Sequence, residues 1–263
     1  MAYQPKIRIG PAGSDGLGPL KGVEKVADLG LECMEVEFTY GVRLKPDAAR
    51  VVGRLAHQKG IRLSVHAPYY INLATEEPDK LAASKQRILD ACHRAHLMGA
   101  KNVVFHAGFY QKRTPQETFA RIRPQIKDLL GIIENKAWQV KLCPEITGKP
   151  SQFGSLDEIM RLKRLAGCSI CVDFAHLFAR HQGEVDWADL LGQLPKRLHA
   201  HFSGIEYGPK GEKKHRAASA EFFEPLAQAL LERRVNATLI CESPQPYEDA
   251  LMMQKVVRQL QAP

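Results

Sequence analysis

The 263-residue sequence lacks several features that would each indicate a special class of protein. No apolar stretch approaches the roughly 20 residues of a membrane-spanning helix, so we expect no membrane partner. No low-complexity segment or shift in composition divides the chain, which predicts a single catalytic domain over residues 1–263. No signal-peptide pattern precedes the first apolar run, and the six cysteines lie in or beside apolar runs, so we expect a reduced, cytoplasmic protein.

An excess of acidic residues is also missing. The chain has 37 Lys and Arg against 29 Asp and Glu, which gives a net charge of +8. A positive balance attracts polyanions and therefore favours a nucleic acid or a phosphorylated substrate, although a solvated basic surface explains the same charge. The hydrophobic share of 44% and the charged share of 25% are typical of globular proteins and exclude extensive disorder.

Short apolar runs alternate with longer segments of helical periodicity along the whole chain. Helical periodicity is clear over residues 81–98, 115–135, 156–165 and 220–234. The pattern predicts an α/β protein with a single (β/α)8 TIM barrel. A doubly wound open sheet is the alternative, but its glycine-rich phosphate turn is missing. The expected buried parallel strands are Lys6–Ile9, Cys33–Phe38, Arg62–His66, Asn102–His106, Lys141–Glu145, Ser169–Asp173, Arg197–Phe202 and Ala237–Glu242.

Imidazoles and carboxylates stand at the carboxyl ends of these strands, where a TIM barrel builds its active site. Such groups would repel one another or stay unpaired if no cation lay among them. A mixed shell of His, Asp and Glu suits zinc or manganese better than magnesium. The sequence therefore predicts a centre of divalent metal ions. Its candidate residues are Glu37, His66, His106, Glu145, Asp173, His176, His201 and Glu242.

Two features next to this rim are expected to support the barrel. His199 lies two residues before His201, so it should face the same side one layer deeper and could support a metal ligand. Cys168 and Cys171 have CxxC spacing, but alternation along a strand would point the two thiols to different faces. We interpret these cysteines as core residues.

Six segments, in this order, resemble the motifs of the endonuclease IV family, which are zinc-dependent apurinic/apyrimidinic endonucleases on a TIM barrel. The resemblance covers nearly the whole chain. Because the His-Ala-Pro-Tyr motif also occurs in related sugar isomerases, the order and spacing of the six segments carry the resemblance. They are SVHAPYYINL (64–73), FHAG (105–108), PEITG (144–148), VDFAH (172–176), HFS (201–203) and CESP (241–244).

The resemblance implies a hydrolase that binds two or three zinc ions, with manganese as the alternative metal. One ion would be held by His66, His106 and Glu145, and a second by Glu145, Asp173, His201 and Glu242. Glu145 would be the catalytic residue, since it bridges the two ions and polarises the attacking water. The reaction would cleave the phosphodiester 5′ to an abasic site in base excision repair.

A third ion in this family uses a histidine that matches His176 and an Asp-x-His pair. His215 matches the second member of that pair, but Lys213 replaces the aspartate. Either Glu206 or Glu212 substitutes for the missing ligand, or Lys213 contacts a phosphate directly. If Lys213 lies beside the two histidines, we expect only two tight metal ions.

The same resemblance implies a partner, double-stranded DNA with an abasic site, and we expect a monomer to bind it. Tyr69 and Tyr70 follow His66 at the place where the family inserts side chains into the duplex. Packing of a loop is the alternative role for these tyrosines. Arg43 and Lys213 are predicted to contact DNA phosphates.

Three functions remain open. The first is the endonuclease. The second is a divalent-metal sugar isomerase or epimerase, which needs only Glu145, Asp173, His201 and Glu242 around one ion. The third is a damage-binding protein that has lost turnover. The additional histidines and the positive charge favour the endonuclease.

Overall fold

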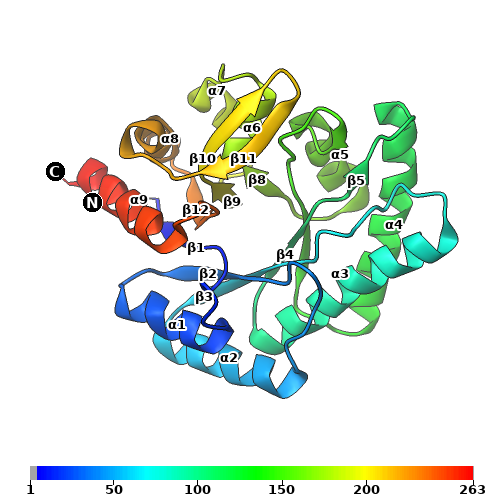
Figure 1. The fold of residues 1–263 in the computed structure, drawn as a ribbon, viewed down its shortest axis with the longest axis horizontal. Helices are drawn as coiled ribbons and strands as arrows, with labels where there is room; N and C mark the ends of the chain where they lie inside the picture. The colour runs from blue at the N-terminus through cyan, green and yellow to red at the C-terminus, as the bar shows by residue number, and fades with distance from the viewer. Residues whose placement is uncertain (1–4, 263) are drawn as a thin grey trace.

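The computed structural model describes residues 5–262. Among these residues, eight parallel strands form a central barrel and helices surround it (Figure 1). The predicted TIM barrel is therefore confirmed, and the open-sheet alternative is wrong. The barrel strands are β1 (Ile7–Pro11), β2 (Cys33–Glu37), β3 (Arg62–His66), β4 (Asn102–Phe105), β6 (Lys141–Pro144), β8 (Cys171–Asp173), β9 (Arg197–Phe202) and β12 (Asn236–Cys241).

Two short parallel bridges close the barrel. They join one half, in the order β1-β12-β9-β8, to the other half, in the order β2-β3-β4-β6. Ala12 pairs with Glu35 at one seam, and Glu145 pairs with Cys171 at the other. Gly10 is required at the first seam, because a Cβ there would overlap the carbonyl oxygen of Cys33. The closed sheet leaves no open edge along the barrel.

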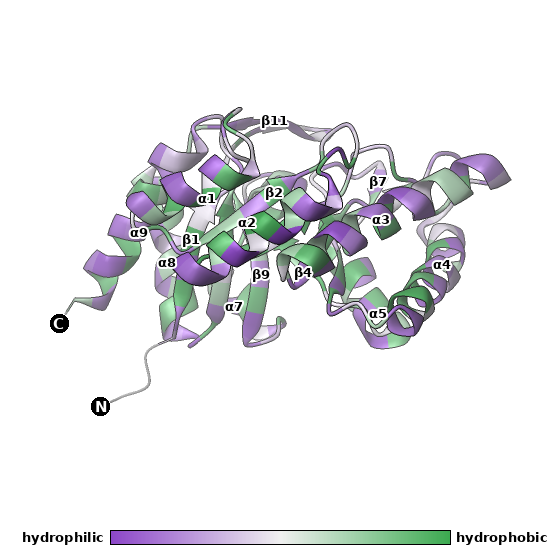
Figure 2. Cartoon of the chain, turned by 90° about the horizontal axis from the view of Figure 1, so that it is seen from below, coloured by the Kyte–Doolittle hydropathy of each residue, from purple (hydrophilic) through white to green (hydrophobic). Residues whose placement is uncertain are grey.

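The helices pack their apolar faces on the barrel and turn polar residues outward, as the colours of Figure 2 show. Their ends follow local rules. Thr114 and Ser155 form capping boxes, and Gly60, Gly99 and Gly167 adopt left-handed conformations after their helices. The helices are α1 (Pro19–Asp28), α2 (Pro46–Lys59), α3 (Pro78–Met98), α4 (Pro115–Asn135), α5 (Leu156–Ala166), α6 (Phe174–Arg180), α7 (Trp187–Gly192), α8 (Ala220–Glu232) and α9 (Pro246–Gln261).

Four further strands lie outside the barrel, and the sequence pattern did not predict them. β5 (Gly108–Phe109) pairs with β7 (Gln152–Phe153), and β10 (Gly204–Gly208) pairs with β11 (Gly211–Arg216). The β10–β11 hairpin lies across one end of the barrel (Figure 2). It brings residues that follow β9 over the carboxyl ends of the strands.

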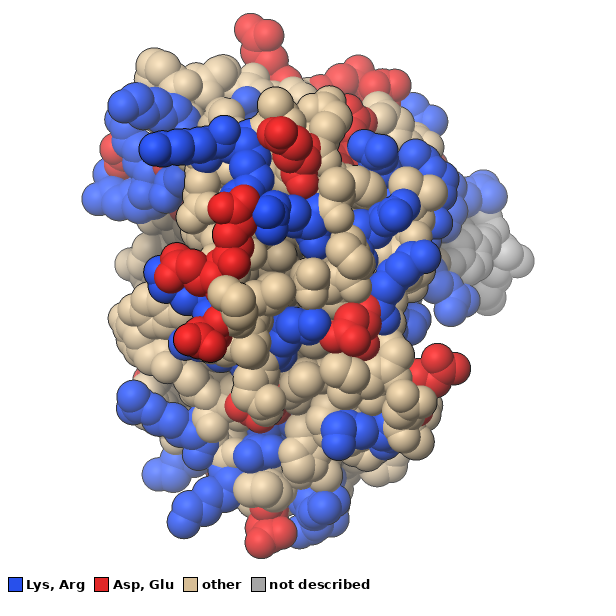
Figure 3. All heavy atoms as spheres, turned by 90° about the vertical axis from the view of Figure 1, so that its right-hand side faces the viewer, with Lys and Arg blue, Asp and Glu red and all other residues tan. Residues whose placement is uncertain are grey.

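Charged side chains cover the outside of the molecule. On the side that carries α3 and α4, Lys and Arg alternate with Asp and Glu (Figure 3), so the net positive charge forms no uniform basic surface there. None of the described helices is both long and apolar enough to cross a bilayer.

Candidate metal centre

The carboxyl ends of the barrel strands bring the predicted ligands together. Six of them end a strand, lie within its last residues or directly follow it, and two come from α6 and β11. Their nitrogen and oxygen atoms form three groups in which all members lie within 4.8 Å of one another. The groups are His66, His106 and Glu145; Glu145, Asp173, His201 and Glu242; and Asp173, His176 and His215.

Glu145 connects these groups. Its carboxylate is fully buried, and its Oε2 lies 3.1 Å from Nε2 of both His66 and His106. Its other oxygen, Oε1, lies 3.3 Å from Nδ1 of His176 and 3.4 Å from Nδ1 of His201. One carboxylate therefore faces four imidazoles, which is the geometry that a bridging metal ligand needs.

Several buried polar atoms at this centre have no hydrogen-bond partner among the described residues, namely Oε1 of Glu145, Oδ2 of Asp173 and Nδ1 of His201. Buried polar groups are normally satisfied, so such a cluster fits a site for cations. His66 donates its Nδ1 proton to the carbonyl of Ala67 at 2.8 Å, which turns Nε2 toward Glu145 for metal binding. The residues present thus fit divalent metal ions.

The carboxylates and imidazoles of the centre shift one another's pKa values. Burial disfavours the charge on Glu145, but His106 and His201 hold the pKa of that carboxyl well below its usual range. Burial also opposes charge on the imidazoles, but Glu145 raises the pKa of His66 to about 9, and Asp173 and Glu145 raise that of His176 to about 10. Without metal, these histidines therefore carry protons at neutral pH.

Glu35 is a buried carboxylate that was not among the residues predicted from the sequence. Its Oε2 is hydrogen-bonded to Nε2 of His199 at 2.9 Å. Its Oε1 lies 2.8 Å from Nε2 of His201, but these two atoms are not aligned for a hydrogen bond. Burial opposes its charge, but His201 and His199 hold its pKa well below the usual range. Glu35 therefore attracts one side of the His201 ring and leaves Nδ1 facing Glu145. His199 lies one layer deeper, as its position in the strand implies.

Residues of the β10–β11 hairpin complete the third group. The pairing of Glu206 with Lys214 and of Tyr207 with Glu212 leaves Lys213 as the extra residue of a β-bulge. In a regular strand, Glu212 and His215 would face opposite sides, but the bulge turns both toward the barrel. Nε2 of His176 accordingly lies 3.3 Å from Nε2 of His215 and 3.5 Å from Oε2 of Glu212.

This arrangement corrects the expected position of Lys213. Its side chain is 59% exposed, and Nζ lies 3.8 Å from Glu206, which also pairs with Arg216. The sequence offered two carboxylates, Glu206 and Glu212, as substitutes for the missing aspartate. Glu206 is paired with Lys213 and Arg216 at the outer side of the hairpin. Glu212 faces the histidines instead, because the bulge shifts the register by one residue.

A pocket of about 370 Å³ opens above the centre. Glu37, Tyr69, Glu212 and Ser243 line it, together with four of the candidate ligand histidines, His66, His106, His176 and His215. Burial, with the nearby Glu242, raises the pKa of Glu37 to about 7. The pocket thus contains a carboxyl group that holds or releases a proton near neutrality.

Exposed tyrosines follow β2 and β3, and one of them, Tyr69, lines this pocket. Tyr69 and Tyr70 are 52% and 64% exposed, and the ring of Tyr69 lies 5.8 Å from that of His66. Tyr40, which follows β2 and was not among the predicted residues, is 74% exposed. Arg43 is exposed on the same connection. The loops after β2 and β3 therefore present aromatic side chains to solvent beside the candidate metal centre.

Known proteins resemble this chain in sequence and in fold. An uncharacterized protein of Methanocaldococcus jannaschii, MJ0133, is 35% identical over 254 residues, which cover 91% of this chain and 92% of that protein. A protein named "Probable endonuclease 4" of Halorhodospira halophila is 30% identical over 180 residues, 62% of this chain and 58% of that protein.

Solved structures agree in fold at low sequence identity. Endonuclease IV of Thermus thermophilus superposes with a TM-score of 0.72 at 22% identity, over 97% of this chain and 98% of that one. A D-tagatose 3-epimerase-like protein gives a TM-score of 0.72 at 18% identity, over 96% of each chain. The family model described as "Xylose isomerase-like TIM barrel" matches residues 23–261. The chain therefore belongs to the xylose isomerase-like TIM barrel family, and its relatives there include proteins named as endonuclease 4.

Proposed function

We propose that the protein is a metal-dependent phosphodiesterase that cleaves duplex DNA 5′ to abasic sites. The observation that carries this proposal is the set of four imidazoles beyond the minimal four-residue group, His66, His106, His176 and His215. They create two further metal-binding groups that share Glu145 and Asp173 with the first. A centre for two or three ions suits displacement at phosphorus, in which charge develops on several oxygens at once.

Zinc or manganese ions held by these residues would activate a water molecule and neutralise the developing negative charge. Glu145 contributes a carboxylate that faces four imidazoles and so holds the groups at a fixed spacing. Glu35 fixes the ring of His201 from the side away from the pocket. Glu37 is placed to hold or release a proton inside the pocket, where the leaving 3′ oxygen needs one.

The rim supplies the DNA contacts in this proposal. Tyr69 and Tyr70, with Tyr40 on the neighbouring loop, are exposed aromatic side chains that suit insertion at a gap in the base stack. Arg43 and Lys213 are exposed cations on the neighbouring loop and hairpin and would contact phosphates. The protein would act as a monomer in the cytoplasm.

The test combines metal analysis with a cleavage assay. Protein purified without chelator is analysed for metal and then incubated with a duplex that contains one abasic site. We expect two or three ions per chain and a single nick 5′ to the site, whereas the same duplex without the lesion stays intact. Two or more bound ions without any nick would point to a damage-binding protein.

A sugar epimerase is the second candidate, because the pocket of about 370 Å³ has the size for a small substrate. It requires one ion at Glu145, Asp173, His201 and Glu242, and two of the carboxylates would move protons. One ion per chain, together with turnover of a ketohexose and no DNA cleavage, would favour it over the phosphodiesterase.

A further inference from the structure

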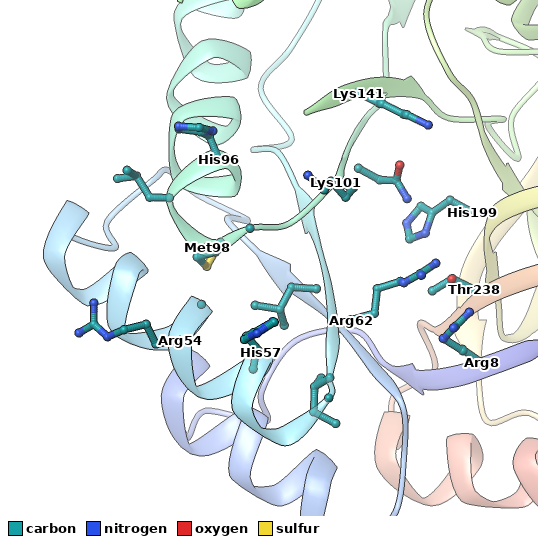
Figure 4. A pocket seen from close by; sticks show the side chains of 18 of the residues that line it. Arg8, Arg54, His57, Arg62, His96, Met98, Lys101, Lys141, His199 and Thr238 are labelled. Atoms are coloured by element: carbon teal, nitrogen blue, oxygen red, sulfur yellow. The ribbon is translucent and has the colours of Figure 1, made fainter. Parts of the chain in front are cut away.

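A second, larger pocket lies at the amino ends of the barrel strands (Figure 4). The candidate metal centre lies at the carboxyl ends, at the other end of the barrel. Its volume is about 1070 Å³, and it continues from the barrel mouth to α2 and α3. Seven Lys or Arg and three His residues are among its lining residues, and no Asp or Glu is among the described residues that line it. The pocket is thus a concave surface of one charge sign.

Most of these cations come from the first residues of the strands. Arg62 begins β3, Lys141 begins β6 and Arg197 begins β9, while Arg8 lies in β1 and Lys101 immediately precedes β4. The closed barrel therefore arranges them as a ring around its mouth. The side chains of Arg8 and Arg62 lie side by side in Figure 4.

The ring is poorly neutralised. Arg8 Nε lies 3.8 Å from Glu32, which is also 3.3 Å from Lys6. No carboxylate of the described residues lies within ion-pair distance of Arg62, Lys101, Lys141 or Arg197. Burial is the largest cause that lowers the pKa of Arg62, and the nearby Arg8 and Arg197 lower it further.

A buried histidine is also among the residues that line the pocket. His199 is 6% exposed, and its Nε2 is taken by Glu35, but its Nδ1 has no hydrogen-bond partner among the described residues. Thr238, its partner in the β9–β12 register, lines the same pocket and lies near His199 in Figure 4. The base of the cationic ring thus contains a buried imidazole with one unpartnered nitrogen.

We propose that this pocket binds a small ligand with a polyphosphate chain, such as a nucleoside triphosphate or free tripolyphosphate. The volume exceeds what one phosphate fills, and several guanidinium groups at one mouth suit an anion with several charges. The cations of the ring surround a concave surface, so a compact, flexible anion reaches several of them at once more readily than a rigid duplex does. This site is separate from the proposed nuclease centre, and its test does not depend on DNA cleavage.

The test measures tripolyphosphate binding to the full chain by calorimetry. The double variant Arg62→Gln/Arg197→Gln removes two cations of the ring, and the control Arg123→Gln/Arg164→Gln removes two exposed arginines from α4 and α5. We expect the first variant to weaken binding by about tenfold or more and the control to change it less than about twofold. Because both variants keep the candidate metal centre, phosphate binding to metal there contributes equally to both.

Adenosine triphosphate and adenosine monophosphate are measured in the same way. If tripolyphosphate and adenosine triphosphate bind with equal affinity, the pocket recognises the phosphate chain alone. If adenosine triphosphate binds more tightly, the pocket recognises a nucleotide. Thermal unfolding shows whether each variant is folded, and Lys141→Gln serves as a second variant of the ring. An equal loss in the control, or binding of a short duplex but not of tripolyphosphate at this ring, would overturn the proposal.

Discussion

At the scale of single residues, the candidate centre depends on carboxylates that each contact several imidazoles. Glu145 is the extreme case, because both of its oxygens lie within 3.4 Å of two histidines. Removing its charge while keeping its volume would leave those imidazoles without their shared anion. The effects of one such change should therefore spread through all three groups of ligands.

Glu145→Gln should lower abasic-site cleavage by about 1000-fold or more, since a neutral amide cannot bridge two cations. Metal content should fall in parallel, while circular dichroism should stay unchanged. Glu134→Gln, at an exposed position on α4, is the matched control. Near-normal turnover of a folded Glu145→Gln protein would remove this residue from the mechanism.

Metal affinity should rise with pH. Without metal, the pKa values of His66 and His176 are raised to about 9 and about 10, so both residues hold a proton at pH 7 that a metal ion must displace. Affinity should increase by about tenfold per pH unit for each proton released. A chelator competition between about pH 6.5 and pH 8.5 measures this slope. A flat profile would contradict the protonation of these two histidines.

At the scale of elements, the strands and several helix ends could be predicted from the sequence because their signals are local. Apolar runs mark buried parallel strands, and the glycines before Ile61, Ala100 and Cys168 adopt the left-handed conformation expected at helix ends. The β10–β11 hairpin could not be predicted in this way, because its second strand, GEKKHR, is mostly charged. Nor does a sequence reveal which residue of a hairpin bulges.

That bulge determines which hairpin residues lie at the third group of ligands. His215 lies beside His176, but the motif comparison put Lys213 where the structure presents Glu212. Glu35 could not be predicted as part of the centre for a different reason. It lies inside an apolar strand, and only the closed barrel shows that its side chain meets His199 and His201.

Glu212→Gln should lower the metal content by about one ion per chain, because it removes the carboxylate of the hairpin that faces His176. Lys213→Ala should leave the metal content unchanged, since Lys213 pairs with Glu206 at the outer side. Elemental analysis of both purified variants decides the point. A loss of metal in Lys213→Ala instead would contradict the assignment of Glu212.

At the scale of the whole molecule, the two ends of the barrel differ in charge. The carboxyl ends of the strands collect Glu and His, and the amino ends collect Arg and Lys. This separation means that the net charge of +8 does not describe the surface that DNA would meet. In our proposal, phosphate contacts at the catalytic end come from a few cations on loops and the hairpin.

Affinity for undamaged duplex should nevertheless fall by about 100-fold or more between about 50 and 200 mM salt, because phosphate contacts release counterions. Fluorescence anisotropy of a labelled duplex measures the slope. Arg43→Gln should make that slope shallower by about one unit if this exposed residue contacts a phosphate. An affinity that does not depend on salt would favour the epimerase.

Asp173 caps the start of α6 and also belongs to the candidate metal centre. Asp173 accepts the backbone N–H of His176 at 2.7 Å through Oδ1, while Oδ2 lies 3.1 Å from the His176 ring. The same carboxylate thus begins a helix and faces the ions that the centre would hold. Order in the first turn of α6 should therefore report metal occupancy, and backbone amides there should exchange with deuterated solvent faster after chelation. Amides in α4, far along the chain, should keep their exchange rates.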